Sequence, residues 1–175
     1  MPKYSVTLNF FMPKKIVEAV KKINISENLI FDWRREGFFH CTVKALESRD
    51  TLPSEQEIKL IIDKVSKIIA NQNKFKVVLE GVGKLPSVFY AKIYSSDLVK
   101  LHKELCKVNL QSINKRFEDE DYIPHASLVS LPKPSNKIIR INKKFGEFIV
   151  DEIQLVVWDI YDGHKPKIYH LFNLK

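Results

Sequence analysis

The stretch Phe38-Phe39-His40-Cys41-Thr42-Val43-Lys44-Ala45-Leu46 alternates apolar and polar side chains with the period of two that is typical of a half-buried β-strand. Side chains two positions apart on a strand point to the same face, about 7 Å apart at about 3.3 Å per residue. His40 and Thr42 therefore stand side by side, opposite an apolar face that carries Cys41. The same alternation puts Lys44 on the face of His40 and Thr42.

A second stretch, Tyr122-Ile123-Pro124-His125-Ala126-Ser127-Leu128-Val129, repeats this arrangement, because His125 and Ser127 share one face of a strand. Two strands that each offer an imidazole and a hydroxyl predict a symmetrical phosphate site. The alternative is two strand histidines whose ring nitrogens are satisfied by neighbouring groups, and the pattern alone does not separate the two interpretations. The remaining histidines lack the pattern: His102, His164 and His170.

Length and composition describe an ordinary globular protein. The 175 residues suffice for one core or for two small lobes that share one, and we predict a single domain of two lobes over residues 1–175. The net charge of +8, from 29 Lys and Arg against 21 Asp and Glu, favours polyanionic partners such as RNA or nucleotides. Lysine-rich solvated helix faces would account for the same charge.

Two cysteines, Cys41 and Cys106, form no Cys-x-x-Cys pair, so a zinc site is not expected and a reduced, intracellular setting is the simpler inference. Four adjacent acids, Glu118 to Asp121, lack the partners of a metal loop and are expected to be solvated. No apolar run approaches ~18 residues, which predicts a cytoplasmic protein with no membrane partner. We expect a monomer.

Periodicity predicts an α+β order of elements. Ser54 and Glu57 match a capping box that begins a helix with an isoleucine-rich stripe. Gly81 and Gly83 are expected to be turn residues, and His102 is expected on the surface of a helix. Besides the two motif strands, the predicted strands are Tyr4–Phe11, Phe75–Glu80, Val88–Tyr94, Phe148–Ile160 and Lys167–Leu174, and the other predicted helices are Pro13–Ile23 and Ser96–Ile113.

The segment from Asn24 to Gly37 is ambiguous. Phe31 and Trp33 suit core anchors, whereas Arg34 and Arg35 could reach a phosphate site. A packed loop with a solvated arginine pair is the favoured interpretation.

With these residues read, the chain resembles the two-histidine (2H) phosphoesterase superfamily, and within it the RNA 2′,3′-cyclic phosphodiesterases, also called 2′-5′ RNA ligase-like proteins. The hallmark of that family is a pair of His-x-Thr/Ser-hydrophobic tetrapeptides, which His40–Val43 and His125–Leu128 match. The resemblance covers nearly the whole chain, because further segments match in order: Phe10-Phe11-Met12-Pro13, Trp33, Phe75–Leu79 and Tyr122-Ile123-Pro124.

The resemblance implies a bilobal α+β fold with pseudo-twofold symmetry, in which two small antiparallel sheets face a central cleft and helices pack outside. One departure concerns charge. Family members often carry Arg soon after the second motif, whereas here Lys133 is the first basic residue that follows. Lys44 is a candidate for the missing charge.

The resemblance further implies a metal-independent phosphoesterase that acts on RNA or nucleotide 2′,3′-cyclic phosphates and needs no cofactor. His40 and His125 would divide the tasks of general acid and general base. Thr42 and Ser127 would donate hydrogen bonds to the non-bridging phosphoryl oxygens. Four aromatic residues are candidates for stacking on a base, and each suits the core equally: Phe89, Tyr90, Tyr122 and Trp158.

Other activities stay open. A 2′-5′ phosphodiesterase or a 2′-5′ RNA ligase would use the same four motif residues. A nucleotide- or RNA-binding module without turnover is an alternative from another class, but binding alone does not require two titrating imidazoles.

Overall fold

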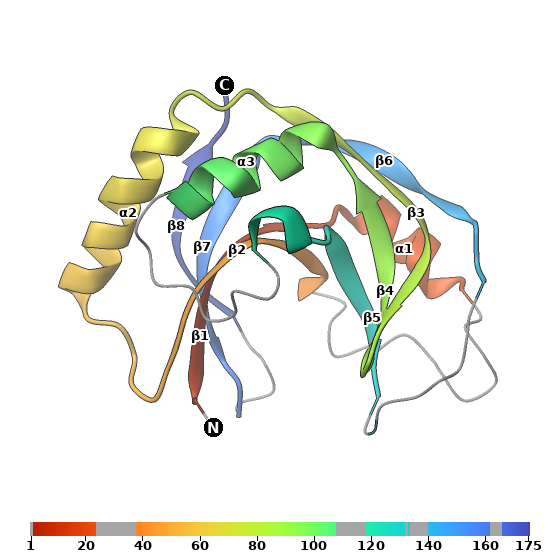
Figure 1. The fold of residues 1–175 in the computed structure, drawn as a ribbon, viewed down its shortest axis with the longest axis horizontal. Coiled ribbons are helices and arrows are strands. Elements are labelled where there is room, and N and C mark those ends of the chain that lie inside the picture. Colours follow the sequence, from red (N-terminus) through yellow and green to blue (C-terminus); the bar gives the residue numbers. More distant parts are fainter. Residues whose placement is uncertain (1, 24–37, 108–117, 132, 134–139, 162–165) are drawn as a thin grey trace.

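The computed structural model describes residues 2–23, 38–107, 118–131, 133, 140–161 and 166–175. It confirms the α+β class (Figure 1). The ambiguous segment from Asn24 to Gly37 and the end of the third predicted helix, beyond Lys107, lie outside the described residues. The elements in chain order are β1 (Tyr4–Phe11), α1 (Lys14–Lys21), β2 (His40–Arg49), α2 (Glu55–Ile69), β3 (Phe75–Leu85), β4 (Val88–Tyr94), α3 (Ser96–Lys107), a 3-10 turn (Asp119–Asp121), β5 (His125–Ser130), β6 (Lys144–Val150), β7 (Glu152–Asp159) and β8 (Pro166–Asn173).

The strands form two four-stranded sheets, and every pairing is antiparallel. We name them the first-motif sheet, with the order β2-β1-β7-β8, and the second-motif sheet, with the order β5-β4-β3-β6. The two motif strands, β2 and β5, each occupy the edge of their own sheet. This equivalence is the pseudo-twofold relation that the family resemblance implied.

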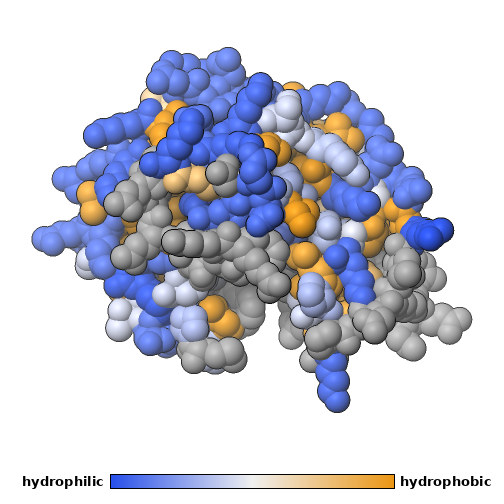
Figure 2. Space-filling model, viewed as in Figure 1, coloured by the Kyte–Doolittle hydropathy of each residue, from blue (hydrophilic) through white to orange (hydrophobic). Residues whose placement is uncertain are grey.

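One cluster of buried apolar side chains draws on both sheets and all three helices. Helix α1 lies against β6, α2 against β8, and α3 contacts both β2 and β3, so that α3 joins the two sheets (Figure 1). Strand β1 lies inside its sheet and is buried on both faces, which places Thr7 and Asn9 among the few buried polar residues. Where the surface is coloured in Figure 2, most of it is hydrophilic, with small groups of hydrophobic residues between.

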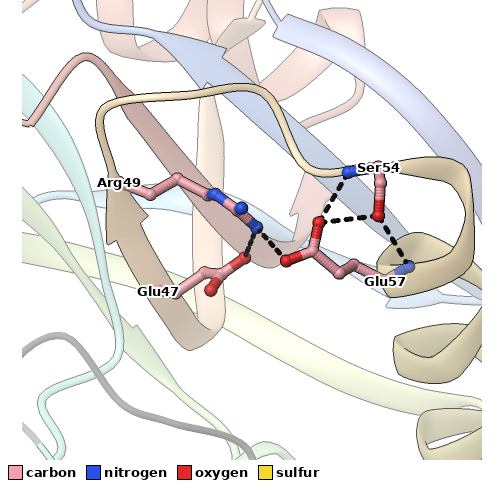
Figure 3. Close-up of polar contacts among 4 residues, drawn as sticks. All are labelled: Glu47, Arg49, Ser54 and Glu57. Atoms are coloured by element: carbon pink, nitrogen blue, oxygen red, sulfur yellow. Dashed lines mark hydrogen bonds and ion pairs between the residues drawn. The ribbon is translucent and has the colours of Figure 1, made fainter.

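Helix α2 begins with the capping box that the sequence predicted (Figure 3). Ser54 Oγ accepts a hydrogen bond from the backbone N–H of Glu57, and the Glu57 carboxylate accepts one from the backbone N–H of Ser54 at 2.7 Å. The other oxygen of Glu57 pairs with Arg49 at the end of β2, at 2.9 Å. These hydrogen bonds lower the pKa of Glu57 to about 2.

The predicted strand Phe148–Ile160 is wrong in one respect, because the structure divides it at Asp151. Strand β6 ends at Val150 and pairs with β3 in the second-motif sheet, whereas β7 begins at Glu152 and pairs with β1 in the first-motif sheet. The chain therefore passes from one sheet to the other at a single residue. Neither Gly nor Pro marks the transition, and only two adjacent acids, Asp151 and Glu152, interrupt the apolar residues there.

The prediction of Gly81 and Gly83 as turn residues is also wrong, since both lie within β3. Gly81 has a φ of +78° and lies at a bulge where the register against β4 shifts. Gly83 pairs with Tyr90, and a Cβ atom at Gly83 would lie 2.3 Å from the Tyr90 ring. The glycine thus makes room for that ring to lie across β3.

Candidate active site

The two motif strands contact each other although they belong to different sheets. The Cys41 thiol, next to His40, hydrogen-bonds to the backbone of His125 and lies 3.9 Å from the Tyr122 hydroxyl. Burial raises the pKa of this thiol to about 12, so Cys41 is a protonated packing group at neutral pH. The fold therefore brings together two sequence motifs that are far apart in the chain.

Both motif histidines are oriented in the same way. His40 Nδ1 donates to the carbonyl oxygen of Phe38 at 2.6 Å, and His125 Nδ1 donates to the carbonyl oxygen of Ile123 at 2.7 Å. In each case the acceptor is the residue two positions earlier. A carbonyl oxygen can only accept, so each neutral ring is protonated at Nδ1 and has its lone pair on Nε2. Backbone bonds thus fix both rings in the same tautomer.

The His40 ring stacks on Trp158 of β7, with ring centroids 4.5 Å apart and planes at 29°. Trp158 is 8% exposed, and its Nε1 donates to Thr7 Oγ1 at 2.8 Å. Phe11 lies near the same imidazole, with a centroid distance of 5.8 Å. The Trp158 side chain thereby supports His40. We predicted it as a platform for a substrate base, but one face of its ring is occupied by this imidazole.

His125 lies on β5 beside β4. Tyr90 approaches its ring edge-on at a centroid distance of 5.1 Å, and Tyr90 is also the cross-strand partner of Ser127. Burial lowers the pKa of His125 below its usual 6.5. His125 and Ser127 thus share a strand face with Tyr90, as the alternation of the second motif predicted.

Lys44 does not lie where the alternation of the first motif placed it. The register of β2 against β1 shifts at Val43, so that Leu8 pairs with Lys44 and Asn9 with Thr42. This β-bulge breaks the period of two. Lys44 is only 2% exposed, and its ammonium group is paired with Glu118 and lies 3.5 Å from Cys106 Sγ. The charge of Lys44 is therefore already neutralised within the protein.

The structure contradicts one of the four aromatic candidates for base stacking and restricts another. Phe89 is fully buried on the core face of β4. Tyr122 stacks face to face on His102 at a centroid distance of 3.8 Å, and its hydroxyl donates to the Thr42 carbonyl oxygen. His102, expected on the surface, is likewise buried.

A cavity of about 370 Å³ lies between the two motif strands. Thr42 and His125 both line it, so one cavity adjoins both motifs. It also has hydroxyl groups from β1 and β2 and the apolar side chains of Leu85 on β3 and of Ile123, which precedes β5. Its lining residues are Ser5, Thr7, Thr42, Val43, Lys44, Ala45, Ser48, Leu85, His102, Glu118, Tyr122, Ile123 and His125.

Sequence reasoning missed Lys92, which is the cross-strand partner of His125. Its stem passes Gly81 on β3, and it has no ion pair with any residue in the described ranges. The alternation of Tyr90, Lys92 and Tyr94 along the strand was a usable signal. What the sequence lacked was the register that sets Lys92 beside His125.

Metal ligands do not gather in the parts of the chain that the structure describes, where no group of three or more His, Cys, Asp or Glu residues could hold an ion. Nor does any helix in these parts have the length and apolar character to cross a membrane.

Comparisons with known proteins show the family and the fold. A family model described as the 2′-5′ RNA ligase superfamily matches residues 13–162. A comparison with curated protein sequences found no match. The fold is similar to TT0787 of Thermus thermophilus, with a TM-score of 0.69 and 20% identity over 97% of each chain.

Two E. coli LigT structures are similar over 100% of this chain and 99% of theirs. The complex with NADP+ has a TM-score of 0.71 and 16% identity. The complex with 3′-AMP has a TM-score of 0.70 and 15% identity. At such identities the likeness shows the shared fold.

Proposed function

This chain belongs to the 2′-5′ RNA ligase superfamily, and from that membership we propose that it is a phosphoesterase that opens 2′,3′-cyclic phosphates of RNA or nucleotides. The observation that carries the proposal is the matched pair of histidines. His40 and His125 stand on edge strands that touch, and each has its Nδ1 held by the carbonyl of the residue two positions earlier. Two similarly oriented imidazoles suit a reaction that needs one base and one acid.

We assign the base to His125 and the acid to His40. The partly buried His125 has a lowered pKa, so its neutral form, with the lone pair on Nε2, predominates near neutral pH. The indole face beneath His40 attracts a cation, which stabilises the protonated imidazole. His125 would take a proton from the attacking water while His40 protonates the departing ribose oxygen, as the bond from phosphorus to that oxygen breaks.

In this scheme, hydrogen-bond donors and a cation must stabilise the negative charge on the phosphoryl oxygens. Thr42 and Ser127 supply a hydroxyl next to each histidine. Because Lys44 is paired with Glu118, we assign the cationic contact to Lys92, whose flexible stem allows its ammonium to approach a phosphate beside His125. No step of this scheme calls for a metal ion.

The alternative activities use the same residues. A 2′-5′ phosphodiesterase or a 2′-5′ RNA ligase would employ both histidines, and in ligation the acid and the base exchange roles. The nucleotide in the 3′-AMP complex of LigT supports a nucleotide as the substrate class. A module that only binds nucleotides would not need the paired tautomers.

The test is a substrate panel with purified protein: 2′,3′-cyclic nucleotides, 2′-5′-linked oligomers and ADP-ribose cyclic phosphate, each with and without EDTA. Products would be separated to show which ester is cut. We expect hydrolysis of the 2′,3′-cyclic nucleotides that EDTA does not change. Tight binding of nucleotide without turnover of any compound would favour the binding module, and loss of activity in EDTA would indicate a metal.

A further inference from the structure

The bulge in β2 gives the first motif an unusual backbone. Val43 has no partner on β1, because Asn9 pairs with Thr42 and Leu8 with Lys44. Among the described residues β2 is an edge strand, so no further strand there pairs with the backbone groups on its outer side. Carbonyls that point outward here need other donors, because a buried backbone acceptor is costly to leave unpaired.

Two side chains from outside the first-motif sheet provide those donors. The Tyr122 hydroxyl donates to the Thr42 carbonyl at 2.8 Å, and His102 Nδ1 donates to the Val43 carbonyl at 2.7 Å. The two rings are stacked, with planes at 6°. Consecutive carbonyls at the bulge are thus held by one stacked pair, which we call the Tyr122–His102 clasp.

The clasp also reaches the second motif. Tyr122 is followed by Ile123, whose carbonyl holds the ring of His125. One short segment therefore contacts the backbone of Thr42 through a side chain and fixes His125 through its main chain. Burial raises the pKa of Tyr122 well above its usual value of 10, so its hydroxyl remains a donor throughout the neutral range.

We propose that Tyr122, supported by His102, is a positioning residue that sets the Thr42 hydroxyl against His125 so that both meet the same phosphate. The inference rests on the proposed function, because it gives Thr42 and His125 a shared phosphoryl ligand. Tyr122 acts through Thr42 and does not itself touch the phosphate. One face of its ring is covered by His102, which agrees with this role.

Tyr122→Phe tests the proposal, because it keeps the ring and removes only the hydroxyl. We expect kcat for 2′,3′-cyclic AMP to fall about tenfold, as for a small misplacement of a catalytic group, with KM changed less than about threefold. Tyr94→Phe is the matched control, since it removes a hydroxyl from a side chain that is 54% exposed. Circular dichroism and the Tm would show that both variants fold.

A double-mutant cycle with Thr42→Val separates positioning from a general structural role. The cycle would be measured twice, on kcat and on the Kd for inorganic phosphate by NMR titration. If Tyr122 acts through Thr42, Tyr122→Phe changes either quantity less than about twofold once Thr42 is Val. The proposal would be overturned if Tyr122→Phe changed kcat and the Kd equally in the wild-type protein and in Thr42→Val. It would also be overturned if Tyr122→Phe had no larger effect than Tyr94→Phe.

The two readouts distinguish this proposal from the proposed function. Coupling in phosphate affinity without any turnover would refute the cyclic phosphodiesterase and support the clasp. Turnover without coupling would refute the clasp alone. Absence of phosphate binding in the unmodified protein would refute the clasp, because no shared ligand would then exist.

Discussion

His40 and His125 have identical backbone restraints and different surroundings. The carbonyls of Phe38 and Ile123 orient both rings, but His40 stacks on an indole whereas the partly buried His125 meets Tyr90 edge-on. An aromatic face favours the imidazolium form, and burial favours the neutral form. The asymmetry of roles in a nearly symmetrical site can therefore come from the neighbours of each histidine.

This contrast predicts the pH dependence. The pKa of His125 is lowered, so the base is deprotonated and active above a value that lies below 6.5. We expect the acid limb of the kcat/KM profile to lie below pH 6.5 and to match the NMR titration of His125. Trp158→Leu weakens the stabilisation of protonated His40 and should move the alkaline limb to lower pH. If Trp158→Leu moved only the acid limb of the profile, His40 would be the base and His125 the acid.

Lys92 allows a prediction about charge. A hydrogen bond to a charged group contributes about 1.5–3 kcal/mol, so Lys92→Ala should lower kcat/KM roughly 10- to 100-fold. Lys100→Ala, on the outer side of α3, removes a lysine that is exposed and serves as the control. Equal kcat/KM values for the two variants in steady-state kinetics would show that Lys92 does not contact the phosphate.

Individual residues also show which side-chain positions could be predicted from the sequence. Period-two alternation correctly paired Cys41 with the buried face and His125 with Ser127. It misplaced Lys44, because a β-bulge adds one residue and leaves no mark in the composition. Lys92 could be assigned to a strand face, but only the register against β5 sets it beside His125.

At the scale of elements, local signals were the reliable ones. The capping box of α2 needs only Ser54 and Glu57, three residues apart, and the structure contains it (Figure 3). The boundary at Asp151 is marked only by two adjacent acids, Asp151 and Glu152, and they do not show that the strands on either side belong to different sheets. The two strands join different sheets, and that choice depends on partners distant in the sequence.

The capping box gives a stability prediction. Ser54→Ala removes the acceptor for the Glu57 N–H and should lower the free energy of unfolding by about 1 kcal/mol, measured by urea denaturation. Activity should not change, since Ser54 lies away from both motifs. Wild-type stability after this substitution would show that the cap contributes nothing.

The pH dependence of the same cap follows from the lowered pKa of Glu57. The carboxylate stabilises the fold above its ordinary value of 4.5, and this contribution is lost as the pH falls toward about 2. The difference between wild type and Glu57→Gln should therefore be present at pH 6 and shrink toward pH 2.

At the scale of the whole molecule, α3 and one shared core connect the two sheets. We propose that residues 1–175 act as one domain of two lobes. Thermal unfolding should then be a single transition, with equal calorimetric and van't Hoff enthalpies. Two separate transitions would mean that the lobes fold independently.

The site itself depends on the whole fold, because β2 and β5, which contact each other, are edge strands of different sheets. No local pattern specifies that contact. The repeated His-x-Thr/Ser motif predicted a shared phosphate site, and the family resemblance added the two sheets that face each other. The structure adds the common tautomer of the histidines and the clasp behind Thr42.

The most direct test of the central claim, that His40 and His125 act together on one phosphate, is the turnover of 2′,3′-cyclic AMP by His40→Ala, His125→Ala and the double variant. His170→Ala, on β8, is the control, and circular dichroism would verify folding. We predict that each single substitution lowers kcat by at least ~10² and that the double variant loses no more than about tenfold beyond that, since groups that act as a unit are not additive. Full turnover in either single variant, or losses that simply multiply in the double variant, would contradict the account.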